Sequence, residues 1–333
     1  MSSQFLTLRR AAHRGSLVLL LLPLALMGSG CGTQAQNAYK VQQDLSEALR
    51  HAQVDTNDTQ ARQWADRAIA IAPHDAATYF DSSAPNPNDP MPQRSVLSVF
   101  GDVGDNPAVA DYMTQAVQKF PTDQRGYQLL AQAQGEIGQT AAQKATAAQL
   151  VAVLNKKLQT PGATDIENLT VALAQAYFDA GDTVNGAATY KKAIQAYPTE
   201  PDPLNGLAYA YAVSGTHLPE ALALATQAVA LAPKKSSATD EQIAEDTADC
   251  QDTLGWVQYH LGHYPEAEQN LLQAVNTLPR LAEVRYHLGL VYIAEGNTDA
   301  ARSELGHAVL LTQNYAAAQQ ALNGLPKAVA ASN

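Results

Sequence analysis

Apolar residues recur at helical spacing along most of the chain, and the pattern repeats every 34 residues. Alignment of residues 248–281 with residues 282–315 places apolar and small residues on one another. The superimposed residues are Leu254-Gly255 on Leu288-Gly289, Gly262 on Gly296, Ala267 on Ala301, Leu271 on Leu305 and Ala274 on Ala308. Leu, Tyr and Ala at this spacing give each helix one apolar face, and no long run alternates in the manner of a strand. The pattern therefore predicts consecutive pairs of helices.

The same register continues toward the N-terminus. It defines five earlier blocks, which are 42–75, 90–123, 124–157, 167–200 and 201–235. Residues 167–235 hold two units and residues 248–315 hold two clear ones, whereas the two units of 90–157 are degenerate. The first block, 42–75, has no turn glycine and resembles the others least. Each block is expected to contain two antiparallel helices.

Glycine and proline mark the predicted helix ends. The glycines between the two helices of a block are Gly104, Gly138, Gly181, Gly215, Gly262 and Gly296. A left-handed residue at a helix C-terminus is least costly as glycine. The prolines that follow second helices are Pro73, Pro121, Pro198, Pro233 and Pro279, and proline stops a helix. Residues 316–325 are expected to form a capping helix, and residues 326–333 a disordered tail.

A 34-residue unit with Leu-Gly, a turn glycine and Ala-x3-Leu resembles the tetratricopeptide repeat, which is a helix–turn–helix unit. The resemblance implies an all-α fold, a right-handed superhelical solenoid of stacked repeats. Helices of about a dozen residues are marginal alone, so each pair must stack on its neighbours to persist.

Three stretches interrupt the pattern. Residues 76–89 are predicted to be a loop rich in Pro and Asn, and residues 158–166 and 236–247 are shorter insertions. The chain could divide into two segments near residues 81–92, or this stretch could be a surface loop on one continuous solenoid. The sequence leaves both possibilities open.

The N-terminal residues 1–30 read as an export signal peptide. Basic residues precede an apolar run at 16–27, which is shorter than the about 20 residues that a membrane span needs. The end of the leader resembles a bacterial lipoprotein signal, which implies acylation of Cys31. Gly28 departs from that motif, which usually has Leu there, and ordinary cleavage that releases a soluble protein remains the alternative. Residues 31–41 would then form a polar tether, in a protein of the bacterial cell envelope.

The expected envelope protein faces the periplasm. Gly32 lacks the acidic character that retains some lipoproteins at the inner membrane, which favours the outer membrane. Its body is acidic: without the three leader arginines, 18 basic residues stand against 32 acidic ones. Such a charge disfavours nucleic acid as a partner.

No motif for chemistry is found. The chain contains no nucleophile elbow, zinc-protease motif, phosphate loop or dinucleotide fingerprint, so no catalytic residue and no cofactor are expected. Cys31 and Cys250 are too few for a disulfide framework or a thiolate metal site. His260, His263, His287 and His307 gather in the last two blocks and are interpreted as ordinary helix-surface histidines rather than metal ligands.

The resemblance places a protein-binding groove on the first helix of each repeat. That face would include Tyr209, Asp249, Asp252, Trp256, Tyr259, His260, Glu283, Tyr286, Leu290 and Ile293. Aromatic anchors flanked by carboxylates would suit a segment with an apolar residue beside Lys or Arg. Alternatively, some of these aromatic rings pack between neighbouring first helices.

Three functions are compatible with these observations. The preferred one is a non-enzymatic scaffold or adaptor for envelope assembly or secretion machinery, which binds other proteins or peptide segments. The second is a periplasmic carbohydrate- or peptidoglycan-binding accessory protein, whose aromatic residues would stack on sugar rings. The third is an enzyme framed by the repeats, for which the sequence offers no catalytic set.

Overall fold

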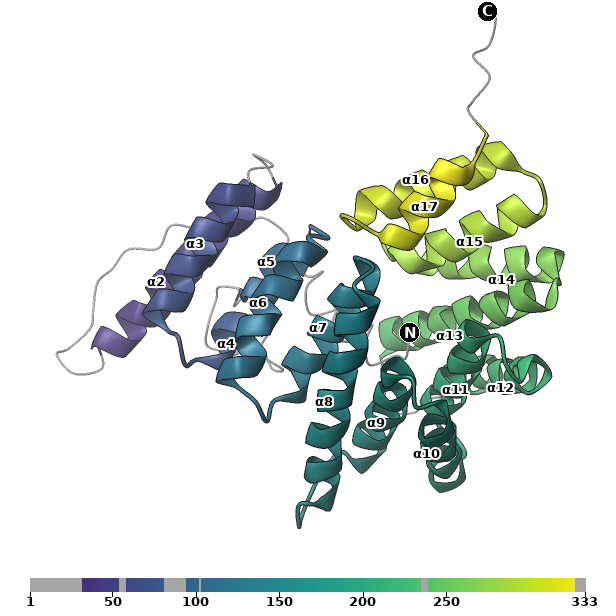
Figure 1. Cartoon of the computed structure of the whole chain (residues 1–333), viewed down its shortest axis with the longest axis horizontal. Coiled ribbons are helices and arrows are strands. Elements are labelled where there is room, and N and C mark those ends of the chain that lie inside the picture. The colour runs from purple at the N-terminus through teal and green to yellow at the C-terminus, as the bar shows by residue number, and fades with distance from the viewer. Residues whose placement is uncertain (1–31, 54–57, 81–93, 102, 235–238, 327–333) are drawn as a thin grey trace, which may run out of the picture. The chain divides into compact units, whose positions relative to one another are not determined.

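The computed structural model describes residues 32–53, 58–80, 94–101, 103–234 and 239–326. These residues form sixteen α-helices and one 3-10 helix and contain no strand (Figure 1). The predicted all-α fold of stacked helix pairs is therefore confirmed. The chain divides into two compact units, which separate between Ala133 and Gln134 rather than near residues 81–92.

The first, which we call the N-terminal unit, covers the described residues from 32 to 133. Its helices are α2 (Gly32–Gln53), α3 (Asp58–Ile71), α4 (Ala76–Tyr79), α5 (Val96–Gly101), α6 (Asn106–Lys119) and most of α7 (Gln124–Glu136). Helix α2 packs on α3 and α5, and the short α4 contacts α3, α5 and α6.

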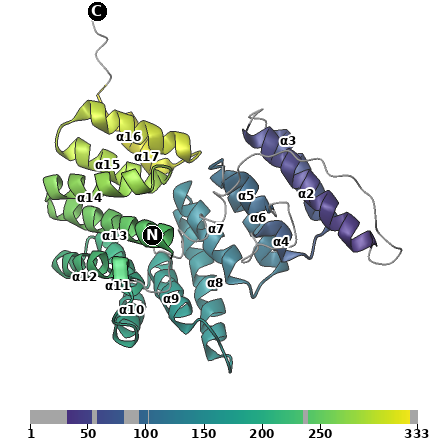
Figure 2. The same cartoon turned by 180° about the vertical axis from the view of Figure 1, so that it is seen from behind.

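The second, which we call the C-terminal unit, covers the described residues from 134 to 326. Its helix pairs follow one another along the chain: α9 (Ile166–Ala180) with α10 (Thr183–Ala196), α11 (Pro201–Ser214) with α12 (Leu218–Leu231), α13 (Asp240–Leu261) with α14 (Tyr264–Thr277), and α15 (Ala282–Ala294) with α16 (Thr298–Leu311). Helix α8 (Thr140–Gln159) packs on α9, and α17 (Ala316–Gly324) packs on α16. Both views show α13 to α16 stacked in chain order (Figures 1 and 2).

Two close helix approaches explain the small residues of the pattern. A Cβ atom added to Gly255 would lie 2.7 Å from Cγ of Leu271, and one added to Gly289 would lie 2.7 Å from Cγ of Leu305. Glycine therefore allows the first and second helices of these pairs to touch.

The predicted turn glycines are confirmed, because all six have positive φ. One of them, Gly262, has a φ of 78° and ends α13.

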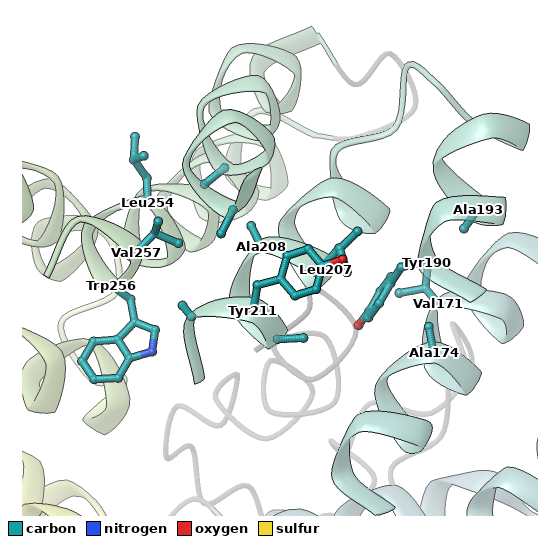
Figure 3. Packing of buried hydrophobic residues seen from close by; sticks show 14 residues of the cluster. Val171, Ala174, Tyr190, Ala193, Leu207, Ala208, Tyr211, Leu254, Trp256 and Val257 are labelled. Atoms are coloured by element: carbon teal, nitrogen blue, oxygen red, sulfur yellow. The ribbon is translucent and has the colours of Figure 1, made fainter. Parts of the chain in front are cut away.

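One core cluster of the C-terminal unit extends from α9 to α13. Val171 and Ala174 of α9 pack with Tyr190 of α10, and the same cluster extends through Leu207 and Tyr211 of α11 (Figure 3). Tyr190 has no exposed surface, and its hydroxyl donates to Gln175 Oε1. A separate small group of Leu204, Ala228, Ala232 and Cys250 packs beside it, so Cys250 is a buried apolar residue.

The polar tether expected at residues 31–41 is not seen, because α2 begins at Gly32. Residues 32–41 contain no proline, and their Ala and Gln residues favour a helix. Cys31 itself and the signal peptide lie outside the described residues. The C-terminal tail from residue 327 does too.

The loop expected at residues 76–89 begins with a helix instead. Asp75 Oδ1 accepts a hydrogen bond from the backbone N–H of Ala77 and caps α4. Tyr79 and Phe80 are buried against Phe120, with ring centroids 5.7 and 6.2 Å away. Burial of these aromatic rings stabilises the short helix α4. The prolines that follow it in the sequence had led to the prediction of a loop. Residues 81–93 lie outside the described part of the chain.

The insertion expected at residues 236–247 is largely an extension of α13. A capping box starts this helix: the backbone N–H of Gln242 donates to Thr239 Oγ1, and Gln242 Oε1 accepts from the backbone N–H of Thr239. Reciprocal bonds of this kind satisfy two N–H groups that a helix start leaves open. Helix α13 therefore reaches two turns beyond the block that the repeat pattern defined.

Candidate functional site

The candidate site lies on the first helices of consecutive repeats in the C-terminal unit. Helices α11, α13 and α15 pack in series, α11 on α13 and α13 on α15. Side-chain hydrogen bonds join these helices, and aromatic rings lie beside the bonds. We call this set the inner face; it comprises Asn205, Tyr209, Asp249, Asp252, Trp256, Tyr259, His260, Glu283, Tyr286 and His287.

Asp249 is held by the preceding first helix. The amide Nδ2 of Asn205 donates to Asp249 Oδ2 across 3.0 Å, from α11 to α13. Asp249 is 2% exposed and Asn205 is 1% exposed. A hydrogen bond to a carboxylate that is this deeply buried offsets part of the cost of removing the carboxylate from water.

Asp252 is held by the following first helix. Its Oδ1 lies 2.8 Å from Nδ1 of His287, which joins α13 to α15. Both side chains are almost fully buried. The interpretation of His287 as a helix-surface histidine is therefore wrong. The residue precedes Leu288-Gly289 and points into the packing between first helices, which periodicity alone did not reveal.

Trp256 is the centre of an aromatic cluster. His287 stacks on its indole at 4.1 Å and 15°, and Tyr259 stacks on it at 5.1 Å and 4°. His260 approaches edge-on at 4.4 Å, and Tyr286 lies 6.5 Å away. The indole projects from α13 on the side opposite Leu254 (Figure 3). Such stacked and edge-to-face pairs stabilise beyond the area that they bury.

Tyr209 of α11 contacts α15, the first helix two repeats further along the chain. Its hydroxyl donates to Oε1 of Glu283 across 2.5 Å, so α11 is bonded to α15. Burial and the neighbouring Glu283 carboxylate raise the pKa of Tyr209 well above its usual value. The hydroxyl therefore keeps its proton and remains a donor.

The remaining predicted groove residues lie on one stripe of α15. Tyr286, Leu290 and Ile293 follow helical spacing. Tyr286 packs against Tyr315 at 5.5 Å, Leu290 packs against the core cluster, and Ile293 is 38% exposed. Burial raises the pKa of Tyr286. The structure therefore gathers the predicted residues on neighbouring helices, although most of them also contact one another.

Asn205 and His287 were not among the predicted groove residues. Each is hydrogen-bonded to a carboxylate on an adjacent first helix, at a distance in sequence of 44 residues for Asn205 and 35 for His287. The sequence signal that could have predicted them is a polar residue on one first helix and an acidic residue on a neighbouring first helix.

The described residues contain no group of three or more His, Cys, Asp and Glu side chains placed to hold a metal ion. Within the same residues, every helix is too short or too polar to cross a membrane.

A family model described as tetratricopeptide repeat matches residues 282–323, which contain α15, α16 and most of α17. Residues 282–323 are therefore similar to a tetratricopeptide repeat, and the earlier helix pairs of the C-terminal unit follow one another in the same helix–turn–helix manner. No curated protein sequence matches the chain.

Three solved structures are similar to parts of this chain. YrrB, a tetratricopeptide protein described as having an unusual peptide-binding site, is 16% identical, with 64% of this chain and 99% of that chain covered and a TM-score of 0.37. MamA is 18% identical, with 50% and 90% covered and a TM-score of 0.37. A chain of the APC/C hetero-tetramer Cut9–Hcn1 is 13% identical, with 87% and 54% covered and a TM-score of 0.42. This chain thus spans about half of that last relative, and similarity this low says nothing of function.

Proposed function

We propose that this protein is a non-enzymatic scaffold of the bacterial cell envelope that binds segments of other proteins on its inner face. The observation that carries the proposal is the gathering of aromatic rings and carboxylates from three consecutive first helices on one face. Aromatic residues dominate the energy of protein interfaces, and carboxylates select basic partners. Assembly or secretion machinery is the class of partner that this location would supply.

Charge supports a basic partner. Asp249, Asp252 and Glu283 stand on the inner face, whereas the cationic candidates on it are two histidines. Burial and the neighbouring His287 lower the pKa of His260, which is therefore neutral at neutral pH. Asp249 and Asp252 are buried, so a segment with Lys or Arg beside an apolar residue would meet the half-buried Glu283 together with Tyr259 and Tyr286.

Binding to carbohydrate is the weaker alternative. A sugar ring packs on the open face of an aromatic ring, but the indole of Trp256 is already stacked with Tyr259 and His287. Titration with peptidoglycan fragments should therefore leave the fluorescence of Trp256 unchanged, read as the difference between the protein and its Trp256→Phe variant.

Peptide selection tests the binding function. A displayed library of random 12-residue peptides would be selected on the purified full chain, beside a variant with Trp256→Ala and Tyr286→Ala. We expect enrichment of peptides with Lys or Arg next to Leu, Ile or Phe, and loss of that enrichment on the variant. Circular dichroism would show that both proteins are helical. Equal enrichment on both proteins, or none on either, would reject the inner face as the binding site.

We also propose that acylated Cys31 anchors the protein to the outer membrane. The cysteine directly after a short apolar leader supports this location, and several acyl chains would give stable attachment. Mass spectrometry of the N-terminal peptide and membrane fractionation would test it against Cys31→Ser. Acyl mass on Cys31 and release of the variant are expected. A membrane-bound Cys31→Ser protein would contradict the anchor.

A further inference from the structure

The turn glycine Gly138 has a close neighbour from the far end of the C-terminal unit. A Cβ atom added to Gly138 would lie 3.3 Å from Cβ of Ala316, the first residue of α17. The other turn glycines of this unit would meet nothing within 4 Å: Gly181, Gly215, Gly262 and Gly296. Because Gly138 lies just before α8 and α17 is the last helix, this contact joins the two ends of the unit (Figure 1).

The helices between these two ends form an uninterrupted series of contacts. From α8 to α17, each helix packs on the next one along the chain. The first helices also pack in series, α9 on α11, α11 on α13 and α13 on α15. Because the ends of the series touch as well, the helices form a closed circuit, and the inner face belongs to helices in the middle of that circuit.

The contact that closes the circuit is small. Gly138 and Ala316 both remain exposed to solvent. Of the nine described residues of α17, only Ala318 is buried. A short helix that buries so little surface has low local stability, so α17 can move while the helix pairs before it stay folded.

The start of α17 is also in contact with the inner face. Tyr315 directly precedes Ala316, and its ring packs on that of Tyr286 with 5.5 Å between the centroids. Tyr286 in turn lies 6.5 Å from Trp256. A displacement of Ala316 away from Gly138 therefore also displaces a ring that covers part of the inner face.

We propose that the contact between Gly138 and Ala316 is a latch, which holds the C-terminal unit closed and opens to give a partner access to the inner face. This proposal rests on the proposed function and adds a conformational step to it. A partner that binds the open form shifts the population toward that form. A large closed population lowers the apparent affinity by the fraction of molecules that are open.

An engineered disulfide tests the latch. The β-carbons of a disulfide lie about 3.5–4.5 Å apart, which is close to the 3.3 Å between a Cβ at position 138 and that of Ala316. The full chain with Cys31→Ser would carry Gly138→Cys and Ala316→Cys and be treated with oxidised glutathione. We expect mass spectrometry to find a disulfide between positions 138 and 316, whereas neither single variant should pair with the buried Cys250.

Peptide binding then reports access to the inner face. The probe is the most strongly enriched 12-residue peptide from the selection described above. Its affinity would be measured for the double cysteine variant in the oxidised form and again after reduction. We expect the oxidised form to bind the peptide at least about 10-fold more weakly, because the disulfide removes the open population.

Gly138→Asn tests the latch without a disulfide. Asn tolerates the left-handed backbone at a φ of 79°, but its Cβ would press on Ala316. We expect faster hydrogen exchange of the α17 amides and about 2–5-fold tighter peptide binding. The matched control is Gly181→Asn, which has a φ of 89° and open space around its Cβ, and should change neither quantity. Circular dichroism would confirm the fold of each variant.

The outcomes separate the latch from the proposed function. If the folded double variant forms no disulfide and Gly138→Asn exchanges like Gly181→Asn, the ends do not meet and the latch is refuted while the binding function stands. Equal peptide affinity of the oxidised and reduced forms would refute the control of access in the same way. If no peptide is enriched at all, the proposed function fails and the access role fails with it, although the disulfide still shows whether the ends meet.

Discussion

The hydroxyl of Tyr209 donates a hydrogen bond of 2.5 Å to Oε1 of Glu283, which stands 74 residues further along the chain. This bond joins α11 to α15 and passes over α13, so first helices that are two repeats apart meet on the inner face. Polar side chains therefore link first helices that are not consecutive in the C-terminal unit.

Tyr209→Phe tests this bond. The variant keeps the ring and removes the donor to a carboxylate, so we expect the free energy of unfolding to fall by about 1 kcal/mol. Urea denaturation would measure the change. The control is Tyr39→Phe, because Tyr39 is 36% exposed and its hydroxyl accepts only a local bond from Gln43. Equal stability of Tyr209→Phe and the unaltered protein would show that the bond contributes nothing.

The buried pair of Asp252 and His287 should behave as a unit. Asp252→Leu or His287→Phe alone leaves one buried group without its partner, which costs about 1–3 kcal/mol or more if that group is charged. The double variant leaves neither group behind. We therefore expect its loss of stability to be smaller than the sum of the single losses by at least about 1 kcal/mol in a denaturation cycle. Strict additivity would argue against an energetic link.

Two glycines in helices should respond oppositely to alanine. A Cβ at Gly255 would meet Cγ of Leu271 at 2.7 Å and the backbone oxygen of Ala267 at 3.1 Å. Gly255→Ala should therefore destabilise the protein by about 1–3 kcal/mol. A Cβ at Gly306 would meet nothing within 4 Å, so Gly306→Ala should stabilise α16 by about 0.5–1 kcal/mol. Melting temperatures that move in the same direction for both variants would contradict this packing.

Asp179 should make stability depend on pH. Burial raises the pKa of Asp179 to about 6, although the hydrogen bond from Gln175 opposes the shift. An unfolded aspartate titrates near about 3.9. The folded protein therefore binds more protons between these values, and the contribution of Asp179 to stability falls as pH rises from about 4 to 6.

Asp179→Asn removes this titration. The free energy of unfolding of the variant minus that of the unaltered protein should be about 1–2 kcal/mol larger at pH 7.5 than at pH 4. The partial exposure of Asp179 keeps this difference small. Denaturation midpoints across this range would measure the difference. Parallel pH curves for the two proteins would mean that Asp179 does not titrate in this way.

Features that depend on neighbours within one helix pair could be predicted from the sequence. The positive φ of Gly262 and the tight contact at Gly255 both follow from a turn and a helix crossing inside one 34-residue block. The sequence also placed the aromatic and acidic residues on first helices.

Features that depend on how repeats stack could not be predicted. The Tyr209–Glu283 bond depends on how three consecutive first helices pack, and the burial of His287 depends on how two of them pack. The helix at residues 32–41 was not predicted for another reason. The polar composition of this stretch suggested a tether, but its Ala and Gln residues favour a helix even where they are exposed to water.

The most direct test of the binding function is photocrosslinking in living cells of the full chain with its own leader. A photoreactive amino acid would replace Ile293, which is 38% exposed on α15, or Leu310, which is 81% exposed on the second helix α16. We expect discrete protein adducts from position 293, lost when Trp256→Ala and Tyr286→Ala are added, and none of comparable yield from position 310. Adducts from position 310 alone, or adducts from position 293 that persist in the double variant, would contradict binding on the inner face.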